Sequence, residues 1–200
     1  MISKDIPLFP LPAVLFPGSY LPLRIFEQRY IDMVRDCCLR DSCFGVCLVN
    51  NSEGPNRPAT HLRIGTTAEI CDFSTLEDGL LGIVARGSQR FVIQSTRMRD
   101  NGLLMAKVNI LPENAAIDLA DEFSVLSLIA QRFMEQVGGN YPSFQPADLQ
   151  DANWVGYRLS ELLPLENNER QKLLEIVDPV ERLQVLLAIL PRFQESGNFE

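Results

Sequence analysis

The sequence has one histidine, His61, and contains no Gly-x-x-x-x-Gly-Lys-Ser/Thr phosphate-binding loop. The second absence excludes a nucleotide site of the P-loop class. A serine–histidine or cysteine–histidine catalytic pair would have to use His61, which follows a polar stretch. The pattern places no neighbouring carboxylate to orient that imidazole, as nucleophilic catalysis requires. The sequence therefore offers no support for these enzyme classes.

Long apolar segments are also absent. No run of 18 apolar residues occurs, so no membrane-spanning helix is predicted. Lys4 and Asp5 precede an apolar stretch that prolines interrupt, which makes a poor signal peptide. The five cysteines are odd in number and lie in apolar surroundings, as is typical of reduced thiols. We therefore expect a cytoplasmic protein.

The net charge of −8 is unevenly distributed along the chain. Residues 1–112 carry a balance of +1, whereas residues 113–200 carry −9. A surface that binds nucleic acid generally presents a basic stripe. An acidic second half argues against such a surface, so a nucleic-acid partner is not expected.

Proline is concentrated near the N-terminus, where five of the 13 prolines lie within residues 6–30, IPLFPLPAVLFPGSYLPLRIFEQRY. Because proline lacks an N–H group and fixes φ, this segment is predicted to form neither a helix nor a central strand. The apolar residues between the prolines predict burial. We therefore expect short strands over Ile6–Phe9 and Tyr20–Ile25, a turn at Pro17–Gly18, and a helix that begins near Glu27.

Strand patterns continue through the first half of the chain. Alternating or β-branched apolar runs predict strands over residues 44–49, 64–73, 80–86, 90–95 and 104–110. Asp78–Gly79 and Asn101–Gly102 predict turns, Gly87 predicts a bulge or a turn, and residues 50–60 predict an exposed loop. In the first helix, Ile31, Val34 and Cys38 recur at helical spacing.

The apolar spacing changes to three or four residues from Asp118 onward. This predicts helices over 118–137, 148–163 and 168–177, the first ending at Gly138–Gly139, and a last helix that begins at Asp178–Pro179. In the last helix five residues are expected to face inward: Val180, Leu183, Leu186, Leu187 and Leu190. Strands followed by helices predict an α+β fold.

Three segments together resemble the N-terminal domain of Lon proteases. In the proline-rich segment the family pattern P-L-x-x-V-x-F-P-G and the helix entry after it are matched at Leu11, Val14, Phe16, Pro17, Gly18, Pro22, Leu23 and Ile31. Residues 64–93 and 162–190 agree as well, so the resemblance covers nearly the whole chain in order. It implies a PUA-like β-barrel with one helix over residues 1–115 and a helical bundle over residues 116–200.

The resemblance also implies a function. In full-length Lon this domain contacts substrate polypeptides, so we expect a non-catalytic module that binds polypeptides or a protein partner in a recognition or adaptor role, without a cofactor. The family's serine–lysine protease domain and its ATPase lie beyond the region matched here, so neither activity is expected. Two alternatives stay open: a PUA-like RNA-binding module, and an enzyme of unknown type that acts in a cleft between the two subdomains.

An extended peptide needs a free strand edge or an apolar groove. The interrupted N-terminal strands and the helix entry after them suggest such a surface. The candidate binding residues are Arg24, Phe26, Glu27, Arg29, Tyr30, Arg86 and Arg90. The alternative for Phe26 and Tyr30 is a role in the core. The alternative for Arg86 and Arg90 is a structural role, in which the glycine between them forms a bulge and a strand-end arginine pairs with an acid.

A metal centre is not expected. The soft ligands are Cys37, Cys38, Cys43, Cys47, Cys71 and His61. Cys43 and Cys47 on one strand would lie about 13 Å apart at ~3.3 Å per residue, which Zn–S bonds of about 2.3 Å cannot bridge. Adjacent cysteines on a helix diverge. We expect all five to behave as small buried hydrophobic residues.

Overall fold

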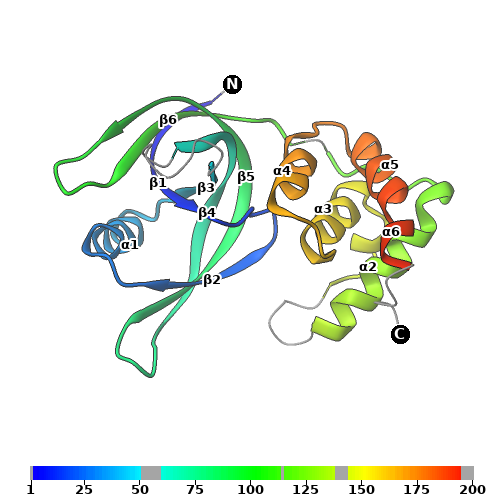
Figure 1. Cartoon of the computed structure of the whole chain (residues 1–200), viewed down its shortest axis with the longest axis horizontal. Coiled ribbons are helices and arrows are strands. Elements are labelled where there is room, and N and C mark those ends of the chain that lie inside the picture. Colours follow the sequence, from blue (N-terminus) through cyan, green and yellow to red (C-terminus); the bar gives the residue numbers. More distant parts are fainter. Residues whose placement is uncertain (1, 51–59, 114, 138–143, 195–200) are drawn as a thin grey trace. The chain divides into compact units, whose positions relative to one another are not determined.

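The computed structural model describes residues 2–50, 60–113, 115–137 and 144–194 (Figure 1). The chain divides into two compact units, residues 1–113 and 114–200. Strands make up most of the first unit and helices the second, so the predicted α+β class is confirmed. Among the helices of the described residues, none combines the length and the hydropathy of a membrane-spanning segment. Two predicted features lie outside the described residues: most of the exposed loop, residues 51–59, and the helix end at Gly138–Gly139.

The first unit consists of a six-stranded sheet and helix α1 (Gln28–Arg40). Its strands are β1 (Ser3–Leu11), β2 (Tyr20–Ile25), β3 (Phe44–Asn50), β4 (Thr60–Thr75), β5 (Leu81–Met98) and β6 (Leu104–Ile110). The strand order is β2-β5-β4-β3-β1-β6, and β5 also pairs with β6. The pairings among β5, β4, β3, β1 and β6 therefore form a closed ring, to which β2 is added along β5 (Figure 1).

Strand β1 lies between β3 and β6 in this order, so the expectation that the proline-rich segment cannot supply a central strand is wrong. The described pairings join Ser3–Pro7 to β6 and Leu8–Leu11 to β3, so each half of β1 has one partner. The Ile110 N–H donates to the Ile2 carbonyl at 2.9 Å, which fixes the alternation of the antiparallel ladder. By that alternation Pro7 needs no N–H toward β6, and Pro10 points away from β3.

Strands 80–86 and 90–95 of the prediction are one strand, β5, because Gly87 belongs to a bulge and not to a turn. Ala68 of β4 pairs with Gly87 and Thr66 pairs with Arg90, so β5 carries one extra residue between them. Only glycine fits at this position, since a Cβ on Gly87 would lie 2.2 Å from the Phe16 carbonyl oxygen. The Pro17–Gly18 and Asn101–Gly102 turns are confirmed, with φ of 76° at Gly18 and 79° at Gly102.

Two apolar clusters stabilise the first unit. One joins residues of the ring strands, including Leu8, Phe91 and Val108. The other lies between the strands and α1, which buries Tyr30, Met33, Val34 and Cys37. Of the predicted stripe, Val34 is buried and Ile31 packs against this cluster, but Cys38 is exposed and Cys37 is buried instead. The difference arises because Tyr30 stacks on Phe9 with ring centroids 4.0 Å apart, a long-range contact that local spacing does not reveal.

The second unit contains α2 (Ser124–Val137), α3 (Ala152–Leu162), α4 (Asn167–Glu175), α5 (Pro179–Ile189) and the short α6 (Pro191–Gln194), with α3 in contact with α2, α4 and α5 (Figure 1). Two helices begin later than predicted. A 3₁₀ turn over Asp121–Phe123 precedes α2, and another over Asp148–Gln150 precedes α3. Helix α3 begins after Asp151, whose carboxylate accepts the Asn153 N–H.

The last long helix begins as predicted, because Asp178 accepts the Val180 N–H at 3.0 Å and Pro179 occupies the first turn. Leu183 and Leu186 are fully buried, but Leu187 is 37% exposed, so its predicted inward position is wrong. Arg182 is buried in this helix instead.

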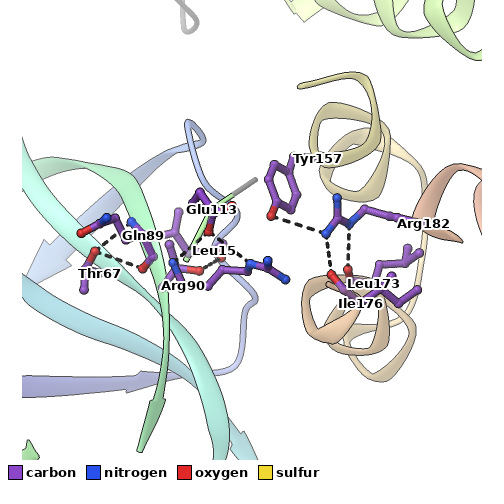
Figure 2. A network of polar contacts seen from close by, with 10 residues as sticks. Leu15, Thr67, Gln89, Arg90, Glu113, Tyr157, Leu173, Ile176 and Arg182 are labelled. Atoms are coloured by element: carbon purple, nitrogen blue, oxygen red, sulfur yellow. Dashed lines mark hydrogen bonds and ion pairs between the residues drawn. The ribbon is translucent and has the colours of Figure 1, made fainter. Parts of the chain in front are cut away.

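Figure 2 shows how Arg182 is accommodated. Its Nε donates to the Leu173 carbonyl at 3.0 Å and its Nη2 to the Ile176 carbonyl at 2.6 Å. The guanidinium lies 4.2 Å from the centroid of the Tyr157 ring. Arg182 therefore satisfies carbonyls at the end of α4 that the helix itself leaves unbonded.

The exposures of Leu186 and Leu187 predict effects of different size when these two adjacent leucines are truncated. Leu186→Ala should lower the free energy of unfolding by ~2–5 kcal/mol, because it leaves a cavity in the core of the second unit. Leu187→Ala should lower it by clearly less, since Leu187 is 37% exposed. Denaturant unfolding followed by circular dichroism measures both. Equal losses in the two variants would contradict this orientation of α5.

Candidate functional site

Five of the seven candidate residues line one groove of about 840 Å³ in the first unit: Arg24, Phe26, Glu27, Arg29 and Tyr30. They are contiguous in the chain because β2 ends at Ile25 and α1 begins at Gln28, which presents the intervening residues on one wall. The end of β1 at Phe9–Leu11 and the β5–β6 hairpin complete the groove, together with Val49 and His61.

The floor of the groove is aromatic. Tyr30 is 9% exposed and stacks on Phe9, which is 6.3 Å from the Phe44 ring. Burial raises the pKa of the Tyr30 hydroxyl above its ordinary value. Tyr30 therefore serves the core as well as the groove.

Phe26 behaves differently, with 67% of its surface exposed. Met98, on the hairpin, also lines the groove and is 70% exposed. The groove therefore has two large apolar side chains exposed to solvent and a buried aromatic floor. These residues come from elements that are distant in sequence.

The charged groups of the groove are paired with one another. Arg29 Nη2 lies 2.7 Å from Glu27 Oε2, and Arg29 Nη1 donates to the Gly102 carbonyl at 3.1 Å. The Arg29 guanidinium also lies 4.7 Å from the centroid of the Tyr30 ring. Arg24 forms an ion pair with Asp78 of the β4–β5 turn. The Arg29–Gly102 bond holds the first turn of α1 to the β5–β6 turn, and the two ion pairs leave the rim close to neutral.

The structure does not bring Arg86 and Arg90 to this groove. Arg86 lines a separate pocket that also contains Cys37, Cys38 and Cys71. Arg90 is 1% exposed, and its Nε lies 3.2 Å from Glu113 Oε1 (Figure 2). Arg90 thus fits the alternative stated for it, a strand arginine paired to an acid.

A second part of the groove lining was not predicted from the sequence. Met98, Leu104 and His61 come from β5, β6 and β4, and only the sheet register places them beside Phe26. Met98 carried one usable signal, an apolar residue among polar neighbours three positions before the Asn101–Gly102 turn. His61, the single histidine, lies in the groove wall with Nδ1 3.2 Å from the Leu62 carbonyl oxygen.

All five cysteines are free thiols. Cys37 and Cys47 are buried as expected, whereas Cys38 and Cys71 are exposed, so the expectation of burial is wrong for these two. Burial raises the pKa of the Cys37 thiol to about 11 and that of the Cys47 thiol to about 12. Within the ranges that the structure describes, no three His, Cys, Asp or Glu side chains are grouped to hold a metal ion.

Comparison with known proteins gives a consistent result. Residues 5–192 match the model of the family described as "ATP-dependent protease La (LON) substrate-binding domain". The chain is 28% identical to a Lon protease of Cytophaga hutchinsonii over 94% of its own length and 24% of that protein. It is 35% identical to a cereblon of Danio rerio over 58% of its own length and 27% of that protein. The chain thus spans about a quarter of these relatives.

Two solved structures are similar in fold. A Lon N-terminal domain protein from Xanthomonas campestris superposes with a TM-score of 0.77 and 39% identity, covering 92% of this chain and 98% of the other. The N-terminal domain of a Mycobacterium avium complex Lon protease gives 0.65 and 19% identity, covering 92% and 97%.

The burial of the thiols predicts their reactivity. Because the thiolate is the reacting species, Cys37 and Cys47, whose pKa values burial raises, should resist modification at pH 8. Exposed Cys38 and Cys71 should react rapidly with iodoacetamide. Peptide mass spectrometry before and after denaturation measures the order, with a Cys38→Ser/Cys71→Ser variant as the control. Rapid labelling of Cys47 in the folded protein would contradict the assignment.

Proposed function

Because the chain belongs to the family of Lon substrate-binding domains, we propose that it is a non-catalytic module that binds polypeptides or a protein partner. The observation that carries this proposal is the groove with Phe26 and Met98 in solvent beside an aromatic floor. Large apolar side chains gathered at a concave surface are typical of a recognition site.

Five candidate residues, Arg24, Phe26, Glu27, Arg29 and Tyr30, contribute to this proposed site, whereas Arg86 and Arg90 do not. We assign Phe26 to direct contact with the partner because it is exposed. Arg29 and Glu27 are assigned to holding the wall, since each already has a partner there. Tyr30 supports the floor through its stack on Phe9.

The proposal also covers the fold, the cellular compartment and RNA as a ligand. We also propose a PUA-like β-barrel over residues 1–115, which the closed ring of strand pairings supports, and a helical bundle over residues 116–200. The free thiols favour a reducing compartment such as the cytoplasm. RNA is disfavoured as a ligand, because Arg24 and Arg29 are paired to acids and the net charge is −8.

Binding can be tested with immobilised casein, a largely unfolded polypeptide, by biolayer interferometry. Phe26→Ser and Met98→Ser should each weaken capture about tenfold, a loss of about 1.4 kcal/mol. Their melting temperatures should be nearly unchanged, since both side chains are mostly exposed.

The matched control is Phe73→Ser. Phe73 is 70% exposed on β4 and does not line the groove, so this variant should bind casein as the unmodified chain does. The proposal fails if the unmodified chain does not capture casein, or if Phe73→Ser and Phe26→Ser weaken capture equally.

A non-catalytic role predicts that the bound polypeptide is released intact. Fluorescein-labelled casein incubated with the chain and Mg-ATP should yield no acid-soluble fluorescence above a heat-inactivated control. ATP-dependent release of acid-soluble fluorescence that persists through a further purification step would show that the chain is catalytic. His61 would then be a candidate catalytic group.

A further inference from the structure

We infer that the groove receives an amphipathic α-helix of a partner protein and not an extended strand. This inference rests on the proposed function and specifies the conformation of what is bound. It depends on which backbone groups the strand edges near the groove can offer. An added strand gains its affinity largely from main-chain hydrogen bonds, so a strand edge without N–H groups is a poor acceptor of one.

The open edge of β1 is interrupted by Pro10. The described pairing of β1 to β6 ends at Pro7. Beyond it, the backbone groups of Leu8 and Pro10 are the ones that point away from β3. Pro10 lines the groove and has no N–H to donate. A strand entering the groove along β1 would therefore find no accessible N–H group on this edge, because Leu8 is fully buried and Pro10 has none.

The outer edge of β2 is interrupted in the same way. The Gly87 N–H donates to the Ser19 carbonyl at 2.9 Å, so the Ser19 carbonyl points toward β5. By alternation along the β2–β5 register, Leu21 and Leu23 bond toward β5, whereas Pro22 lies in a non-hydrogen-bonded pair with Val84. Pro22 consequently occupies the middle of the outward-facing positions, where it blocks the addition of a strand.

The side chains of the groove offer an extended backbone few hydrogen bonds. Arg24 is paired with Asp78, and Arg29 is bonded to Glu27 and the Gly102 carbonyl. Arg29 Nε lacks a partner within the described structure, but this atom is buried and out of reach of a ligand. An extended peptide pressed into an apolar groove would leave its own N–H and C=O groups unsatisfied.

A helix avoids this cost, because its backbone groups bond within the helix. Its contribution to recognition is a row of large apolar side chains at positions i, i+4 and i+7, which is the form of partner that an apolar groove accepts. Phe26 and Met98 supply exposed contacts for such a row, and the stacked Phe9 and Tyr30 supply the floor. The paired charges of the rim impose no strong requirement on the charge of the helix.

The test uses two fluorescent probe peptides of identical composition, 18 residues of Leu, Ala, Glu and Lys. In one, leucines recur at i, i+4, i+7 and i+11, and a hydrocarbon staple holds the helix. In the other, leucines alternate with polar residues, and the same staple residues are left unlinked. Fluorescence anisotropy gives both affinities. We expect the stapled helix to bind at least tenfold more tightly, and Phe26→Ser to remove that preference while Phe73→Ser keeps it.

A second measurement distinguishes the modes directly. N-methylation of alternate amides in the alternating peptide blocks strand addition and should leave its weak binding unchanged. The inference is overturned if the alternating peptide binds as tightly as the helix, or loses affinity on N-methylation, while casein capture still depends on Phe26. It is also overturned if neither probe binds although casein does. Loss of casein capture itself would remove the proposed function as well.

Discussion

The strand arrangement of the first unit depends on the positions at which proline removes a backbone N–H group. Pro7, Pro10 and Pro22 all lie inside strands, which proline normally weakens by removing a ladder donor. Each occupies a position whose N–H would point away from the neighbouring strand: Pro7 away from β6, Pro10 away from β3 and Pro22 away from β5. Turning either strand so that one of these prolines faced its paired neighbour would remove a ladder hydrogen bond there. The prolines thus favour the observed orientation of β1 and β2, and Pro10 and Pro22 leave gaps in the N–H groups on the other sides of these strands.

The same constraint shapes the groove. Because β1 changes partner at Pro7, its last residues leave the β6 pairing and present Phe9 and Leu11 beside the β5–β6 hairpin. The Phe9–Tyr30 stack then holds α1 against this surface, and Arg29 ties the first turn of the helix to Gly102. The site is therefore built on strand ends and a helix start that long-range contacts hold in place, which favours a wall that is already formed before a partner arrives.

The helical unit buries a charged side chain at a position where an apolar residue is usual. Arg182 lies where an apolar residue would continue the stripe of α5, and it bonds the carbonyls of Leu173 and Ile176 at the end of α4. Exchange of such a residue for an apolar one would leave those carbonyls unbonded in the core. Arg90 has a comparable position in the first unit, where Glu113 balances its charge.

Several features follow from local chemistry and are predictable from the amino-acid sequence. These are the Pro17–Gly18 and Asn101–Gly102 turns, the bounds of β2, the cap of α5 at Asp178, the α+β order and the wall of the groove formed by residues 24–30. Long-range contacts set the central place of β1, the burial of Tyr30 and Cys37 on α1, the exposure of Leu187 and the groove wall with Met98. Turns and caps depend on contacts within about four residues. The strand register, the burial of Arg182 and the pairing of distant walls depend on partners tens of residues away, which no local pattern specifies.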